Sequence, residues 1–117
     1  MLLDNLITFL ECNFDKYKNE HDWLAKQIIK GIRNGTCDYI SKNGEIIACV
    51  RFNIINDGRV ADILDFAVKE NNDGIGIMKY FIARAWLQFP CLIYVRFNRM
   101  IKYPDREHRI YELTRFL

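Results

Sequence analysis

The segment from Asn71 to Gly76 combines residue types at a spacing that suits anion binding. It follows an alternating apolar stretch, precedes an amphipathic helical one, and carries glycine at positions 74 and 76. The first N–H groups of a helix lack backbone partners and carry partial positive charge, and glycine lets a ligand approach them closely. The pattern therefore predicts a nest for phosphate or pyrophosphate, with a bare strand-to-helix turn as the alternative. It is neither a P-loop nor a dinucleotide-binding fingerprint, because no Lys-Ser/Thr pair follows Gly76 and hairpins lead into the preceding strand.

Two carboxylates on the strand before this loop, Asp62 and Asp65, are candidates for a general base. A carboxylate set among apolar neighbours on a strand can take a proton from an attacking amine, directly or through water. The alternative for each is a structural salt bridge, with Arg51 or Arg59 as the partner.

Other residue types that carry chemistry give weaker signals. Tyr94 and Tyr103 are candidates to protonate a leaving group, although tyrosines near strand ends usually serve packing. His21 and His108 have no metal-ligand spacing, so we predict no metal site. Without any C-x-x-C pair, we expect free and mostly buried thiols at Cys12, Cys37, Cys49 and Cys91.

The charge distribution argues against nucleic acid as the main partner. The net charge is only +2, although basic and aromatic residues are interleaved over residues 96–115. That stretch could form a nucleic-acid groove, but its acids favour a solvated, salt-bridged edge. No apolar run approaches the roughly 18 residues that span a bilayer, and the N-terminus lacks a signal-peptide pattern, so we expect a cytoplasmic protein.

Hydrophobic periodicity indicates the elements that must position these residues. Turn signals at Asn43-Gly44 and Asp57-Gly58 predict two hairpins, and Pro90 ends the last helix. The predicted order is α-α-β-β-β-α-β-β in one domain, 1–117, of the mixed α/β class, with a mainly antiparallel sheet flanked by helices. The expected helices are 4–11, 22–34 and 76–88, and the expected strands are 37–41, 45–55, 59–69, 91–97 and 109–116.

The alternation in 45–55 predicts which side chains face the core. It places Arg51 and Asn53 on a face that is at least partly wet. Trp23 and Trp86 fall in predicted helices and are expected to anchor the core. The opposite, apolar face of the strand is predicted to hold Ile46, Ala48, Val50, Phe52 and Ile54.

Two hairpins, a glycine loop, a helix and a further strand together resemble the GNAT family of N-acetyltransferases. The family's loop reads Arg/Gln-x-x-Gly-x-Gly/Ala, and here Asn71, Gly74 and Gly76 stand at its three defining positions. The resemblance implies that the loop amides hold the pyrophosphate of an acyl-CoA, acetyl-CoA being the expected donor. It assigns this role to Asn71, Asn72, Asp73, Gly74, Ile75 and Gly76.

The resemblance also gives roles to the preceding strand, which in the family carries a bulge and splays from the next. The backbone of Phe66, Ala67 and Val68 would hold the pantetheine arm and the thioester carbonyl. Asp62 or Asp65 would be the base, and Tyr94 or Tyr103 the acid for the leaving thiolate. The chain departs from the pattern in its neutral Asn71 and in the acids Glu70 and Asp73 beside the loop. The family's helix after the fifth strand is either absent or collapsed into 98–108.

The sequence therefore predicts an N-acyltransferase that acetylates an amine of a protein or small molecule. The first alternative is a catalytically inactive relative that serves as an interaction or structural protein, phage-encoded given its brevity and composition. The second is a small nucleic-acid-binding protein that uses residues 96–115. Whether the chain forms a homodimer is left open by the sequence.

Overall fold

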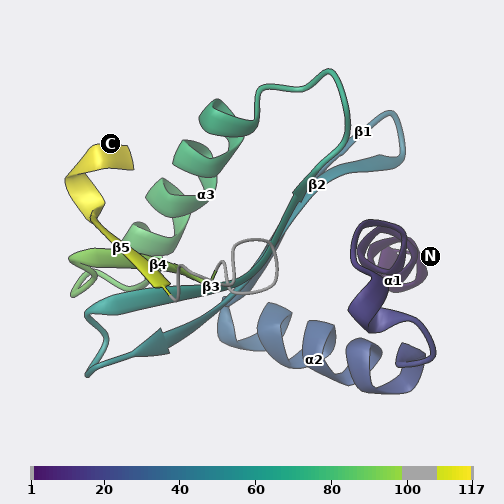
Figure 1. The fold of residues 1–117 in the computed structure, drawn as a ribbon, viewed down its shortest axis with the longest axis horizontal. Coiled ribbons are helices and arrows are strands. Elements are labelled where there is room, and N and C mark those ends of the chain that lie inside the picture. Colours follow the sequence, from purple (N-terminus) through teal and green to yellow (C-terminus); the bar gives the residue numbers. More distant parts are fainter. Residues whose placement is uncertain (1, 99–107, 117) are drawn as a thin grey trace.

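A computed structural model describes residues 2–98 and 108–116 of the chain (Figure 1). The predicted element order is confirmed, with two short 3₁₀ helices added. The helices are α1 (Leu2–Asn13), η1 (Asp15–Tyr17), α2 (His21–Asn34), α3 (Gly74–Gln88) and η2 (Leu113–Phe116). The strands are β1 (Cys37–Lys42), β2 (Glu45–Ile55), β3 (Val60–Val68), β4 (Tyr94–Asn98) and β5 (His108–Glu112).

The strands form one sheet in the order β1-β2-β3-β4-β5. Every neighbouring pair is antiparallel except β3 and β4, which are parallel because α3 forms the crossover between them. Both predicted hairpin turns are present. Asn43 and Gly44 adopt φ of 55° and 79°, the left-handed conformations that a tight β1–β2 turn requires. The mixed, mainly antiparallel fold class is confirmed.

Helices cover both faces of the sheet (Figure 1). On one face α3 packs through Met78, Phe81 and Ile82 against the apolar side chains of β2 and β3. On the other, α1 and α2 bury a second cluster. That cluster comprises Leu6, Ile7, Leu10, Tyr17, Leu24, Ile28, Cys37, Ile46 and Cys49. No helix in the described part of the chain is long and apolar enough to cross a membrane.

Several predicted boundaries shift. Helix α3 begins at Gly74 rather than 76, because Asp73 caps it. Strand β4 begins at Tyr94 rather than 91, since the chain after Pro90 first makes a turn in which Leu92 N–H donates to Phe89 O at 3.1 Å. The predicted last strand ends at Glu112, and the remaining residues form η2.

Four predictions about burial were wrong in part. Arg51 is buried, because α2 and η1 cover the face that the alternation marked as wet. Ile46 packs in the α1–α2 cluster, since a register shift in the β1–β2 ladder turns it to the opposite face from Ala48. Trp23 and Trp86 are 46% and 41% exposed. The four thiols are free, but only two of them are buried, whereas Cys12 and Cys91 are exposed.

Candidate functional site

A bulge in β3 opens the sheet at its centre. In the β2–β3 ladder Arg51 opposes Asp65 and Phe52 opposes Ile63, so Leu64 has no opposite residue. On its other side β3 pairs with β4 only as far as Ile63, which opposes Phe97. A bulge bends its strand and increases the local twist. The two parallel strands therefore diverge beyond Ile63, and the second half of β3 has no ladder partner on that side within the described residues.

The open edge of β3 presents backbone hydrogen-bonding groups. Lys69 N–H donates to Ile47 O at 2.7 Å, which fixes the alternation of the antiparallel ladder. By this alternation the amide and carbonyl of Ala67 face Cys49 on β2. Those of Phe66 and Val68 face the gap. Of the three residues predicted to hold a pantetheine arm, two are thus oriented to do so.

The gap forms an apolar cleft of about 870 Å³. This is within the range of small-molecule sites. Ile75, in the first turn of α3, is 75% exposed at its rim, an unusual position for a large apolar side chain. The cleft is lined by Phe66, Asn72, Asp73, Gly74, Ile75, Met78, Lys79, Phe97, Tyr111, Arg115 and Phe116.

The predicted anion loop closes one end of this cleft. Asn71 adopts φ of 67°, so its place is explained by backbone conformation, which Asn tolerates better than most residues. The Asn72 side chain donates to the carbonyls of Lys69 and Glu70, at 2.9 and 3.1 Å, and holds the turn together. Both side chains thus serve the geometry of the loop.

Asp73 and the two glycines define the start of α3. The Asp73 carboxylate accepts from Gly76 N–H at 3.0 Å, which satisfies one of the amide donors predicted to bind phosphate. A Cβ on Gly76 would lie 2.4 Å from that carboxylate, so glycine at 76 is required by the cap. A Cβ on Gly74 would meet nothing within 4 Å. Because Gly74 also lacks a positive φ, the protein itself gives no reason for glycine there.

Positive charge reaches the cleft from an unexpected element. Lys69, which directly precedes Glu70 in the sequence, pairs with Glu45. Lys79 lines the cleft, and so does Arg115 from η2. Sequence reasoning noted the bases of the C-terminal stretch but did not assign Arg115 to this site, because only the β4–β5 pairing brings η2 against α3.

The candidate tyrosines separate in space. Tyr94 opposes Val60 at the far end of β3, away from the cleft. Tyr103 lies outside the described residues. Tyr111, on β5, lines the cleft, with its ring centroid 5.8 Å from that of Phe97.

Asp65 lies at the centre of a buried polar network on the α1–α2 face. Its carboxylate accepts from Tyr17 Oη at 2.6 and 2.7 Å and from Arg51 Nε at 2.8 Å, and Lys16 Nζ lies 3.1 Å away. Burial and the bond to Asp65 raise the pKa of Tyr17. Although burial opposes it, the charges of Asp65 and Tyr17 raise the pKa of Arg51. The Asp65 carboxylate is fully enclosed and is not accessible to a substrate.

Asp62 is the more accessible of the two acids. Its carboxylate accepts from Arg96 Nε and Nη2 at 2.9 and 3.0 Å, and 15% of its side chain remains exposed. It belongs to the last but one paired position of β3 and β4, directly before the strands diverge. Among the described residues no group of three His, Cys, Asp or Glu side chains is placed to hold a metal ion.

Comparison with known proteins identifies relatives of this arrangement. The model of the acetyltransferase (GNAT) family matches residues 3–86. No curated protein matches the chain in sequence.

Solved structures match the fold at low sequence identity. A crystal structure of aminoglycoside 6'-acetyltransferase type Ii superposes with a TM-score of 0.66 at 11% identity, over 82% of this chain and 63% of that one. Aminoglycoside 6'-N-acetyltransferase complexed with coenzyme A gives 0.66 at 10% identity, over 89% and 66%. The Escherichia coli GNAT family N-acetyltransferase YhbS in complex with CoA gives 0.58 at 15%, over 95% and 76%. The chain thus spans less than two thirds of the first of these.

Replacing each acid by its amide distinguishes their structural roles. Asp65→Asn leaves Arg51 buried beside a neutral partner, which typically costs about 3–5 kcal/mol of unfolding free energy. Asp62→Asn breaks an ion pair that keeps some solvent exposure and replaces it with a neutral hydrogen bond, so it should cost less, about 1 kcal/mol. Urea denaturation of the two variants checks this, and equal losses would contradict the network described above.

Proposed function

The chain belongs to the GNAT family of acetyltransferases, and we propose that it binds an acyl-CoA in the β3–β4 cleft and transfers its acyl group to an amine. Acetyl-CoA is the proposed donor. The observation that carries this proposal is the continuity of the open β3 edge with the α3 N-terminus. The backbone donors of β3 and of the first turn of α3 line one continuous path there, together with Gly74, which has no Cβ.

The chain's own residues fit the parts of such a donor. Phe66 and Val68 offer backbone groups to an amide-bearing arm, in the way that an added strand would pair with a sheet edge. The N–H groups of the first turn of α3, together with Lys79 and Arg115, suit phosphates. Backbone donors at the divergence would polarise a thioester carbonyl placed there.

We assign the handling of protons to two side chains. Asp62 is the proposed base, because it lies beside the divergence and retains some exposure, whereas Asp65 is enclosed. Arg96 donates two hydrogen bonds to Asp62, so proton transfer from an ammonium group would pass through water or accompany the loosening of this pair. Tyr111 takes the place of Tyr94 as the proposed acid for the thiolate, because it lines the cleft.

A non-catalytic acyl-CoA-binding domain is the second candidate. It is favoured by the pairing of both acids, which leaves no free carboxylate near the divergence among the described residues. The two candidates share the cleft and differ only in turnover.

The test of the cleft is Gly74→Ala. A methyl group there meets no protein atom within 4 Å, so the melting temperature should not fall. The same methyl would stand in the path of the phosphates, and acetyl-CoA affinity measured by calorimetry should drop about tenfold or more. Gly76→Ala is a poor substitute, since it collides with the cap. Wild type that fails to bind at millimolar acetyl-CoA, or unchanged affinity in Gly74→Ala, would overturn the proposal.

Removing the charge of Asp73 should raise, rather than lower, the affinity for acetyl-CoA. Asp73→Asn keeps an acceptor for Gly76 N–H and removes a negative charge close to the phosphates. At an effective dielectric near that of water this repulsion amounts to about 1 kcal/mol, so acetyl-CoA should bind roughly fivefold more tightly. The gain should shrink as salt rises. Asp73→Ala is the control, because it also loses the cap; an Asn variant that binds more weakly would refute this reading of Asp73.

Turnover separates the two candidates. Asp62→Asn should lower the rate of CoA release in the presence of an amine by about 10²-fold or more if Asp62 is the base. Acetyl-CoA affinity should stay the same, since Asp62 is not among the residues that line the cleft. Wild-type protein that binds acetyl-CoA without releasing CoA to any amine would favour the non-catalytic candidate.

A further inference from the structure

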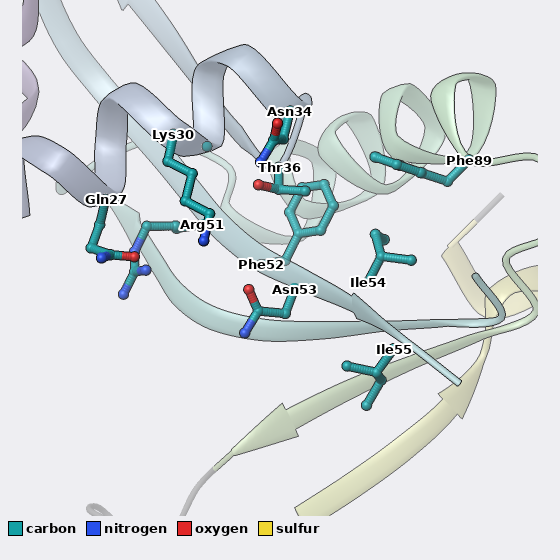
Figure 2. Close-up of a pocket in the computed structure, with 11 residues that line it drawn as sticks. Gln27, Lys30, Asn34, Thr36, Arg51, Phe52, Asn53, Ile54, Ile55 and Phe89 are labelled. Carbon is teal, nitrogen blue, oxygen red and sulfur yellow. The ribbon is translucent and has the colours of Figure 1, made fainter. Parts of the chain in front are cut away.

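A second cleft, of about 480 Å³, lies at the edge of the sheet, between the C-terminal half of α2 and the end of β2. Figure 2 shows Gln27 and Lys30 reaching from α2 toward Arg51 and Asn53 on β2. The cleft exists because the first residue of β1, Cys37, opposes Arg51, whereas β2 continues beyond this pair to Ile55. It is lined by Gln27, Lys30, Gly31, Asn34, Thr36, Arg51, Phe52, Asn53, Ile54, Ile55 and Phe89.

The charge of this cleft is of one sign. Lys30 and Arg51 are cations, and no acid is among the residues that line it. Asp65 neutralises Arg51 from behind, but Lys16 also contacts Asp65, so two cations share one carboxylate and Lys30 adds a third positive charge. Lys30 forms no ion pair within the described residues. The surplus positive charge makes the cleft attractive to an anion.

Arg51 has donors left for a ligand. Its Nε bonds to Asp65 and its Nη2 to Tyr17, which uses two of the five N–H groups of a guanidinium. Among the described side chains no fully buried nitrogen or oxygen lacks a hydrogen-bond partner. The Nη1 atom, which makes no such bond, is therefore accessible, and Arg51 lines this cleft. The amides of Gln27 and Asn53 stand beside it as neutral donors (Figure 2).

The end of α2 does not cancel this attraction. A helix C-terminus carries partial negative charge on its free carbonyl groups. Here Gly31 O accepts from Thr36 N–H at 2.7 Å, and Ile32 O accepts from Gly35 N–H at 3.4 Å. These two carbonyls are already occupied, so the side chains determine what the cleft binds.

The cleft adjoins the proposed reaction point. Asn53 opposes Asp62 on β3, and Asp62 opposes Arg96 on β4, so the three lie in one row across the sheet. Neighbouring strands lie about 4.8 Å apart, which places the floor of the cleft roughly 5–8 Å from Asp62 and the start of the divergence. The acyl-CoA cleft lies on the α3 face, whereas Lys30 and Arg51 of the second cleft come from α2 and from the network that α2 covers.

We propose that this second cleft binds the acceptor through an anionic group, a carboxylate or phosphate, and that Lys30 and Arg51 are its ligands. The inference rests on the proposed function, since it names the substrate class of the same site. A separation of 5–8 Å corresponds to about two residues of extended chain, so the amine lies about four to six bonds from the anion. Two of the structural relatives are named as aminoglycoside acetyltransferases. An aminoglycoside is a polycation, and Lys30 and Arg51 would repel it from this cleft.

The experiment is a chain-length series of ω-amino acids from glycine to 6-aminohexanoate. The controls are n-alkylamines of equal length, which lack the anionic group. Aminoalkyl phosphonates form the phosphate arm. Acetyl transfer is followed as CoA release. We expect kcat/KM to peak at 5-aminopentanoate or 6-aminohexanoate and to exceed that of the matched alkylamine about tenfold, the worth of one charge-assisted hydrogen bond. The better of the carboxylate and phosphonate arms identifies the anion.

The variant that tests the assignment is Lys30→Gln. It should reduce the ratio of kcat/KM between amino acid and alkylamine to near one, whereas Lys42→Gln, which removes the same charge from β1, should leave the ratio unchanged. Equal rates for amino acids and alkylamines, or a preference for aminoglycosides, would overturn the inference.

Direct binding separates this inference from the proposed function. Glutarate, which has no amine, should bind wild type more tightly than Lys30→Gln in ligand-observed NMR, with or without turnover. Glutarate binding without any acetyl transfer would contradict the proposed function and keep the anion cleft. Acetyl transfer to alkylamines without glutarate binding would support the proposed function and contradict the anion cleft.

Discussion

The buried pair of Arg51 and Asp65 fixes the point at which the sheet opens. These two residues oppose each other at the ladder position that adjoins the unmatched Leu64. A shift of the register by one residue would turn every side chain of β3 to the other face and leave a charge unpaired in the interior, which is costly. The pair therefore pins the bulge, and the bulge separates β3 from β4. The cleft on the α3 face depends on that separation.

The two faces of the sheet divide the chemistry. The α3 face is apolar and ends at a helix N-terminus with Lys79 and Arg115 nearby, a surface suited to a long molecule with phosphates at one end. The α2 face holds the polar network and the cationic cleft. Because the divergence of β3 and β4 is an opening in the sheet itself, groups held on the two faces meet there. Packing on each face can thus be optimised for one substrate without altering the other.

Local signals in the sequence were sufficient for the elements and for the strand–loop–helix junction at 71–76. Asn43-Gly44 predicts the β1–β2 turn because only such residues adopt its left-handed conformations at low cost. The burial of Arg51, by contrast, depends on Tyr17 and Lys16, which are more than thirty residues away in the chain. The bulge at Leu64 has no marker in the sequence, since leucine fits a regular strand equally well. Arg115 and Tyr111 enter the cleft only through the β4–β5 pairing, a contact that periodicity does not encode.

Asp73 shows how the fold and the ligand compete for the same donors. The first turn of α3 has few free N–H groups, and the Asp73 carboxylate already takes that of Gly76. A cap stabilises the helix start by about 1 kcal/mol, whether or not a ligand is present. In the proposed complex, phosphates would therefore bind through the remaining amides and through Lys79 and Arg115. Because those side chains are flexible and exposed whereas the amides are fixed, the affinity for an acyl-CoA depends more on salt here than it would in a loop without the acid. The glycine at 74, for which the fold itself has no use, is the residue that keeps the remaining amides accessible.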